Sequence, residues 1–390
     1  MTTQATASDR PASAPIASLG AVASLFLRLG TTAFGGPAAH IALMQEEVVS
    51  RRAWLTSQEF LDLVGATNLI PGPNSTELAI HIGHRVAGWR GLLVAGICFI
   101  LPASMIVGVI AWAYVRYGTL PAAQGILYGV KPVVLIVVGQ ALWKLARTCL
   151  STRRLTILAL ADVALILLGL DELIVLFGTG VIAIVLSGVV PRRPPHGAFL
   201  LGAPLAAPAA VAAATPFGLW PLFLFFVKVG SVLFGSGYVL IAFLRSGMVE
   251  RNGWLTEQQL LDAIAVGQVT PGPVFTTATF IGYLLAGSAG AAVATIGIFV
   301  PAFLFVAISA PFVPRLRQSP TVGAFLDGVN VASLALMAVV SVQLVPAALV
   351  DPVSSILAAA SAILLFRYRV SSTWLIFGAA VAGVIAWSVS

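Results

Sequence analysis

Long apolar stretches run along almost the whole chain, and short polar or charged stretches separate them. A helix that crosses a bilayer needs about 20 mainly apolar residues. The pattern predicts such helices at residues 16–35, 90–114, 122–146, 154–170, 172–190, 219–236, 289–313, 323–346, 353–366 and 372–388. It therefore predicts an all-α polytopic membrane protein.

The pattern of the first half recurs in the second half. Matching residues include Phe26 and Phe226, Gly30 and Gly230, Trp54 and Trp254, Thr56 and Thr256, and, after a one-residue deletion, Gly83 and Gly282. We therefore predict two homologous transmembrane repeats, at residues 16–190 and 219–390. Residues 1–15 are predicted to form a disordered N-terminal tail, and residues 191–218 a cytoplasmic linker between the repeats.

A break interrupts the apolar sequence once in each half, at Pro71-Gly72-Pro73 and at Pro271-Gly272-Pro273. A capping box starts the helix before each break, formed by Thr56 with Glu59 and by Thr256 with Gln259. From start to break the helix is ~20 Å long, whereas the hydrocarbon core is ~30 Å thick. Broken backbone survives in a membrane only inside protein or beside a wet cavity. Each half is thus predicted to contain a re-entrant helical hairpin as well as about five transmembrane helices.

Loop charges indicate how the repeats are oriented. The loop around residues 144–154 contains Lys144, Arg147, Arg153 and Arg154, whereas its counterpart at Val345–Asp351 has no Lys or Arg. The next loop reverses the bias, with Asp171 and Glu172 in the first half and Arg367 and Arg369 in the second. Because Lys and Arg favour the cytoplasmic side, we predict that the repeats are inverted.

Composition narrows the function classes. The chain is 59% hydrophobic and 9% charged, whereas soluble domains are about 25% charged. Its net charge of +7 sits in short loops, which is typical of the positive-inside rule rather than of nucleic-acid binding. There is no phosphate loop to use ATP, no cysteine cluster and no dinucleotide fingerprint. We expect no enzyme, no metal and no cofactor; Ser75 near His81 is the nearest approach to a hydrolase site, and it lacks a third member.

Two cations occupy matching positions in the first predicted span of each half. Arg28 and Lys228 lie about a dozen residues into that span, hence near the midplane. A midplane cation marks a substrate or ion pathway by default. The structural alternative is an ion pair with an acid such as Glu77 or Asp62.

A new helix is predicted directly after each break. Its free N–H groups and the positive end of its dipole form an anion site. The candidate substrate-binding residues there are Gly72, Asn74, Ser75, Thr76, Gly272, Thr276 and Thr277, with Asn68 and Gln268 just before the breaks. The alternative is a packing kink, for which Pro-Gly is common.

Glu77 and His81 are the candidates for proton coupling. Glu77 has Thr277 as its counterpart, so the acid is present in one half only, and an intramembrane acid is a candidate proton site. An ion pair with Arg28 is the alternative role for Glu77. His81 titrates near neutral pH, but its place on the outward helix also suits an interfacial side chain.

The paired motifs resemble those of the chromate ion transporter family in its long, two-domain form. They are Phe34-Gly35-Gly36, Trp54-Leu55-Thr56 and Pro71-Gly72-Pro73, with Phe234-Gly235-Ser236, Trp254-Leu255-Thr256 and Pro271-Gly272-Pro273 as counterparts. The resemblance covers the chain from about residue 25 to its end. It implies a secondary transporter in the bacterial inner membrane that exports chromate, is driven by the proton gradient and confers chromate resistance.

Other transport functions stay open at this point. Sulfate or another oxyanion is an alternative substrate, for uptake or exchange, and a passive anion channel is a further alternative. The partners we expect are chromate or sulfate, protons as the coupling ion and the lipid bilayer, with a homodimer left open.

Overall fold

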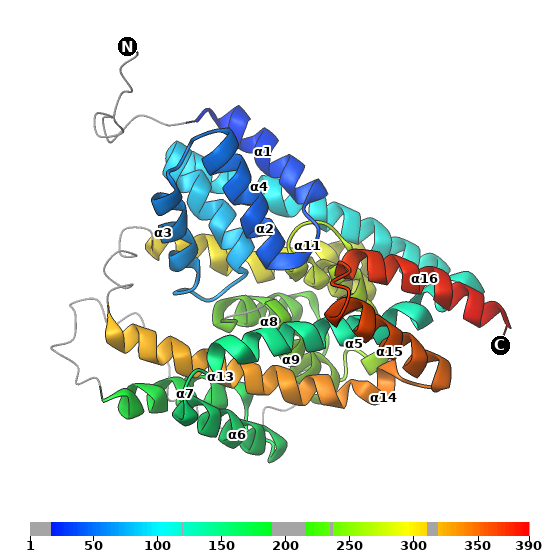
Figure 1. The fold of residues 1–390 in the computed structure, drawn as a ribbon. Coiled ribbons are helices and arrows are strands. Elements are labelled where there is room, and N and C mark those ends of the chain that lie inside the picture. Colours follow the sequence, from blue (N-terminus) through cyan, green and yellow to red (C-terminus); the bar gives the residue numbers. More distant parts are fainter. Residues whose placement is uncertain (1–16, 119, 189–214, 235–236, 310–318, 390) are drawn as a thin grey trace, which may run out of the picture.

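The computed structural model describes residues 17–118, 120–188, 215–234, 237–309 and 319–389 (Figure 1). The first half contains α1 (Leu19–Thr32), α2 (Gly36–Gln45), the π-helix η2 (Glu46–Arg51), α3 (Ser57–Thr67), α4 (Asn74–Tyr117), α5 (Pro121–Cys149), α6 (Arg153–Leu167) and α7 (Glu172–Ser187). The second contains α8 (Leu219–Val232), η4 (Gly237–Val239), α9 (Leu240–Leu244), the π-helix η5 (Arg245–Arg251), α10 (Glu257–Val269), η6 (Val274–Thr276), α11 (Thr277–Ser309), α13 (Pro320–Gln343), α14 (Val345–Ala348), α15 (Pro352–Phe366) and α16 (Ser372–Val389). The predicted tail at 1–15 and residues 191–214 of the predicted linker lie outside the described residues.

The described part of the chain is all-helical, as predicted. Four of its helices are long and apolar enough to cross a membrane, at Asn74–Tyr117, Pro121–Cys149, Val274–Ser309 and Pro320–Gln343. The ends of α5, α6, α7, α13, α15 and α16 agree with the predicted spans to within a few residues wherever the structure describes them. α4 and α11 begin well before the predicted starts at 90 and 289, because each includes the helix that follows the break and precedes the kink. The chain is thus a multi-pass membrane protein.

The predicted span at residues 16–35 is wrong in its length. α1 has 14 residues, or about 21 Å of helix, and the chain turns at Gly35 and Gly36, whose φ values are 101° and 77°. Pro37 then starts α2, which runs into η2 and was not predicted. α8 also has 14 residues and is followed by a second short helical segment. The left-handed glycines separate α1 from α2, so the apolar stretch does not continue as one helix.

Both helix breaks occur where they were predicted. α3 starts with the Thr56–Glu59 capping box and ends at Thr67, and helix resumes at Asn74. α10 starts with the Thr256–Gln259 capping box and ends at Val269. The backbone of Thr56 and the guanidinium of Arg85 lower the pKa of Glu59. Arg85 contacts Glu59 at 2.7 Å. The start of α3 therefore lies beside the end of residues 74–86, the first part of α4.

A matching kink follows each break. In α4 it lies at Ala87 (φ −143°, ψ 20°) and Gly88 (φ 64°, ψ −155°). In α11 it lies at Ala286 (φ −148°, ψ 29°) and Gly287 (φ 59°, ψ −149°). Next to each kink two glycines face each other, Gly83 with Gly91 and Gly282 with Gly290, and they allow the two parts of the helix to lie close together. The repeat is therefore present in backbone geometry as well as in sequence.

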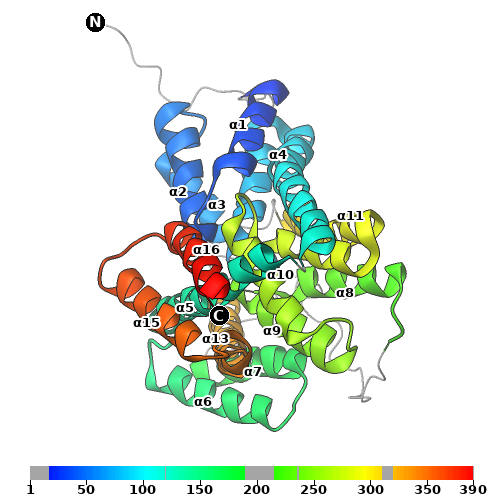
Figure 2. The same cartoon turned by 90° about the vertical axis from the view of Figure 1, so that its right-hand side faces the viewer.

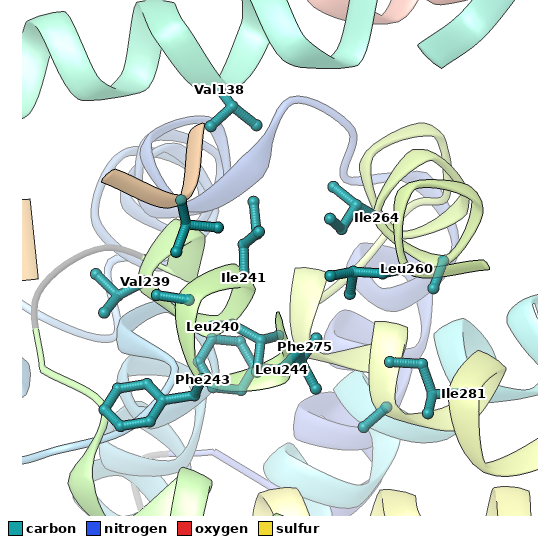
Figure 3. Packing of buried hydrophobic residues seen from close by; sticks show 14 of the residues in the cluster. Val138, Val239, Leu240, Ile241, Phe243, Leu244, Leu260, Ile264, Phe275 and Ile281 are labelled. Carbon is teal, nitrogen blue, oxygen red and sulfur yellow. The ribbon is translucent and has the colours of Figure 1, made fainter. Parts of the chain in front are cut away.

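The two halves exchange their last helices. α15 and α16 pack on α5 of the first half, and α6 and α7 pack on α13 of the second half (Figures 1 and 2). Glycines allow close contact in both places, with Gly129 against Ala379 and Gly328 against Thr179. The largest apolar cluster lies between α5, α9, α10 and α11 and includes Val138, Leu240, Leu260 and Phe275 (Figure 3).

Candidate functional site

The two Pro-Gly-Pro breaks are each bonded to the other half. The N–H of Gly72 donates to the carbonyl of Leu233 just after α8, at 2.7 Å, and the N–H of Gly272 donates to the carbonyl of Ala33 just after α1, at 2.9 Å. The two bonds relate equivalent atoms of the two repeats. The breaks therefore meet the ends of the first helices at the contact between the halves. In this conformation the two glycine N–H groups, which were predicted to bind an anion, are already occupied.

The start of α4 holds buried polar side chains next to the first break. The amide nitrogen of Asn74 donates to the side-chain oxygen of Asn68 at 3.0 Å, so these two predicted residues bridge the break. Ser75 and Thr76 are buried. The hydroxyl of Thr76 has no hydrogen-bond partner among the described residues. A hydroxyl of this kind is available to a ligand.

Glu77 is the most enclosed acid of the described chain. Its side chain has no exposed surface, and neither carboxylate oxygen has a hydrogen-bond partner in the described part. The carboxylate lies against Gly72, where a Cβ would overlap its oxygen Oε1. His81 lies one turn further along the same face, is buried, and has an unpartnered Nε2 within the described residues. The two proton-coupling candidates thus share one face beside the break.

The second break has its polar groups satisfied locally. The hydroxyl of Thr276 donates to the carbonyl of Pro273, and the hydroxyl of Thr277 donates to the carbonyl of Val274, both at 2.8 Å. Gln268 is partly buried in the last turn of α10. The predicted binding residues of this half therefore contact backbone in this conformation.

Arg28 forms an ion pair, but with a different acid from those considered. Its guanidinium lies 2.5 Å from the carboxylate of Glu47 and not beside Glu77 or Asp62, and its side chain is 47% exposed. Glu47 also contacts Arg51 and Arg52. A cavity of about 200 Å³ lies beside Arg28 and Glu47. Glu47 was not predicted as the partner of Arg28, because the helix that holds it, η2, was not predicted.

Lys228 lies on the exposed face of α8. It has neither an ion pair nor a hydrogen bond within the described residues. Arg28 likewise lies off the face of α1 that packs through Gly30 on α4. The two matched cations thus differ, since Arg28 is neutralised by an acid and Lys228 has no acidic partner in the described chain.

A second charged cluster joins the halves. The ammonium of Lys131 in α5 lies 3.0 Å from the carboxylate of Asp262 in α10 and donates to Gln258 at 2.7 Å. The hydroxyl of Tyr114, near the end of α4, donates to Asp262 at 2.8 Å. Lys131 was not among the residues predicted to bind the substrate.

Charges at the ends of the helices are paired as well. Arg251 of η5 contacts Asp171 at 3.1 Å and Glu172 at 3.7 Å. Arg245 contacts Glu250 and Glu257. Acidic partners therefore neutralise both arginines.

A family model described as chromate transporter matches residues 20–186 and 220–384. The chain belongs to the chromate transporter family. The two matched segments fall on the two repeats. Family membership and fold together make this a multi-pass membrane transporter.

Relatives of this transporter match over nearly the full chain. The chromate transport protein of Cupriavidus metallidurans is 32% identical over 388 residues, which cover 98% of this chain and 96% of the relative. A probable chromate transport protein of Synechococcus elongatus is 33% identical over 385 residues, covering 96% of this chain and 97% of the relative. The chromate transport protein of Pseudomonas aeruginosa is 30% identical over 339 residues, covering 82% and 79%. No solved structure matches the chain.

Proposed function

We propose that this protein is a secondary active transporter that exports chromate across the bacterial inner membrane, is coupled to protons and confers chromate resistance. Three relatives named chromate transport proteins, or probable ones, support the substrate. The absence of a phosphate loop from the sequence supports an ion gradient as the energy source. The single observation that supports the coupling is Glu77, which is fully enclosed at the first helix break and whose carboxylate has no hydrogen-bond partner among the described residues.

The repeats are proposed to be inverted, each with a re-entrant hairpin. Gly96 of α4 packs against Phe303 of α11, and Leu92 clusters with Val306, which supports antiparallel packing of these two helices. The contact of Tyr114 with Asp262 supports the same orientation, since it joins the end of α4 to the beginning of α10. These contacts support the inversion independently of the loop charges.

Labelling of single cysteines tests this topology. Ser57→Cys and Glu257→Cys replace equivalent residues at the first turn of α3 and of α10, in a protein whose native Cys98 and Cys149 are changed to Ser. An impermeant thiol reagent is expected to label one of them from outside and the other only from inside. Labelling of both from the same side would mean parallel repeats.

In the proposed mechanism the first break carries the proton. A buried carboxyl group with no partner costs free energy as an anion, so Glu77 is suited to take up and release a proton as its surroundings change. His81, one turn away, is placed to pass protons toward the end of this helix segment, just before the kink at Ala87 and Gly88. Protonation then changes the electrostatic potential at the neighbouring start of α4.

Chromate is proposed to bind between the two breaks. The hydroxyls of Ser75 and Thr76, the first turn of α4 and the ammonium of Lys228 would contact its oxygens and charge. Thr276, Thr277, Asn68, Gln268 and Arg28 complete the proposed set, together with Gly72 and Gly272. The two glycine N–H groups join only when the breaks separate from the carbonyls of Leu233 and Ala33. Exchange of these partners would accompany alternating access.

The test is chromate flux into proteoliposomes under an imposed pH gradient, with sulfate as competitor. The wild type is expected to show gradient-driven flux. Glu77→Gln is expected to reduce the dependence on the gradient by between about 5-fold and 150-fold, the usual range for coupled sites, and to keep chromate counterflow. Thr277→Val, at the matching position, is the control for coupling: it removes one proposed chromate contact, so it is expected to weaken binding but to keep the dependence on the pH gradient.

Other outcomes separate the alternatives. Sulfate flux without chromate flux would keep the transporter and overturn the substrate. Currents that need no gradient coupling would indicate a channel. Full coupling in Glu77→Gln would overturn the role of Glu77.

A further inference from the structure

Lys131 is placed as an anion ligand in the middle of the membrane. It follows Pro121, the first residue of α5, by ten positions, which corresponds to about 15 Å of helix in a core ~30 Å thick. Its side chain is only 16% exposed. A buried intramembrane cation marks a substrate or ion pathway by default. Arg28, at 47% exposed, is much less enclosed.

The ammonium of Lys131 has N–H donors that a ligand can use. It hydrogen-bonds to the oxygen of Gln258, and it faces Asp262 as an ion pair in which oxygen Oδ1 has no aligned hydrogen-bond partner within the described residues. A lysine ammonium has three N–H donors. The side chain of Gln258 is itself held by the carbonyl of Ala347 at 3.1 Å. One contact of Lys131 is therefore fixed, and the other is an electrostatic contact that an anion can replace.

The acidic partner comes from the broken element of the other half. Asp262 lies in α10, which leads to the second break, whereas Lys131 lies in the long helix α5. Any movement of that broken element relative to α5 changes their separation. In the first half the equivalent Asp62 accepts from Gln58, and the residue that matches Lys131 is Asn330. Asn330 carries no charge, so an ion pair equivalent to that of Lys131 with Asp262 cannot form between the matching positions of the other repeat.

We propose that Lys131 is a cation that binds the transported oxyanion dianion, and that Asp262 is its resident counter-ion, whose place the anion takes when α10 moves away from α5. This inference rests on the proposed function and adds a ligand to it. A buried charge that loses its partner costs several kcal/mol. Exchange of the carboxylate for an oxyanion leaves the ammonium neutralised in both states.

The proposal differs from a purely structural ion pair in what it predicts for a double variant. Binding of chromate to the purified protein, and the half-saturating concentration for transport, are measured for Lys131→Gln, Asp262→Asn and both together. Asp262→Asn removes the internal competitor and is expected to lower the half-saturating concentration by about 5-fold or more. Lys131→Gln and the double variant are expected to lose binding. Lys131→Arg is expected to retain it.

A structural role would give the reverse pattern. The single variants would then lose stability, and the neutral double variant would regain transport, because replacing both members of a buried pair is often tolerated. That result, or unchanged chromate binding in Lys131→Gln, would overturn the proposal. Lys144→Gln on the same helix and Asp62→Asn at the equivalent position are controls that are expected to keep normal binding.

The wild type separates this inference from the proposed function. If wild-type protein moves neither chromate nor sulfate, the proposed function fails. If it moves chromate and Lys131→Gln binds chromate equally well, only the role of Lys131 fails. Thermal unfolding in detergent checks that each variant is folded; if Lys131→Gln is not, Lys131→Arg and Asp262→Asn still decide.

Discussion

The two halves of this transporter share a backbone and differ in their charges. Both have a short first helix, a Pro-Gly-Pro break and a kink with nearly the same dihedral angles, and each break donates one hydrogen bond to the other half. Yet Glu77 in the first half corresponds to Thr277 in the second, and Asp262 meets a lysine whereas Asp62 contacts Gln58. The scaffold is symmetric, and the titratable groups are not.

This difference follows from what each part has to do. In the proposed alternating access by inverted repeats the two halves would exchange conformations, and that exchange would constrain glycines, breaks and helix contacts in both halves alike. Binding one proton and one anion places no such demand on both halves. A single acid at one break and a single cation facing the other are sufficient, so these positions are free to diverge.

The largest expected effect compares the two break glycines. A Cβ on Gly272, at φ +84°, would lie 2.6 Å from the Cβ of Ala103 and 3.1 Å from the carbonyl of Gly30. A Cβ on Gly72, at φ +140°, would meet the side chain of Glu77, which can move. We expect Gly272→Ala to destabilise by about 2–6 kcal/mol, from backbone strain plus overpacking. Gly72→Ala should cost about 1–3 kcal/mol from strain.

Unfolding of the purified proteins in detergent measures this order. Gly88→Ala is the matched control, since its φ is also positive and nothing lies within 4 Å of an added Cβ. It should behave like Gly72→Ala in stability. A larger loss of stability in Gly72→Ala than in Gly272→Ala would contradict this order. It would show that Gly272 is not packed more tightly against Ala103 and Gly30 than Gly72 is against Glu77.

The matched cations give the next largest effect. Lys228 has no acidic partner in the described chain, whereas Arg28 is paired with Glu47. Lys228→Gln is therefore expected to reduce chromate flux by roughly tenfold, a typical binding contribution of about 1.4 kcal/mol. Arg28→Gln is expected to have a smaller effect, because Glu47 keeps Arg51 and Arg52. Equal losses in both variants would favour one shared site of two equivalent cations.

Local signals account for most of what the sequence predicts correctly. The capping boxes at Thr56 and Thr256 satisfy helix N–H groups within three residues. Pro-Gly-Pro removes backbone donors and adds a left-handed residue. The helix that leads to each break and the break itself can therefore be predicted from neighbouring residues. Long apolar stretches locate α5 and α13, because this signal also comes from consecutive residues.

Contacts between distant segments could not be predicted. The partners of Lys131 lie in another repeat, and the carbonyls that occupy Gly72 and Gly272 follow helices of the opposite half. The early end of α1 was also missed, although Gly35-Gly36-Pro37 is a stop signal, because the apolar stretch around it is long enough for a full span. Hydrophobicity gives the length of an apolar segment, but the left-handed glycines decide whether the helix continues through it.

The smallest expected effect compares the caps of two equivalent helices outside the membrane core. Asp351 caps α15, where the backbone N–H of Ser354 and the hydroxyl of Tyr128 lower the pKa of its carboxyl, whereas Thr152 caps α6 through one bond at 3.3 Å. Asp351→Asn keeps a capping side chain but removes the negative charge at the helix start, which is expected to cost about 0.3–1 kcal/mol at neutral pH. Thr152→Ala removes the cap and is expected to cost about 0.5–1 kcal/mol.

The two caps differ in their dependence on pH. A lowered folded-state pKa means that the contribution of Asp351 is fully present above its unfolded value, near ~3.9, and is lost as the pH falls through the folded value. The difference in unfolding free energy between wild type and Asp351→Asn should therefore shrink below about pH 4. The difference for Thr152→Ala should stay constant, because a hydroxyl does not titrate there. Unfolding in detergent between neutral and acidic pH measures both, and a constant difference for Asp351→Asn would mean that its cap acts without the charge.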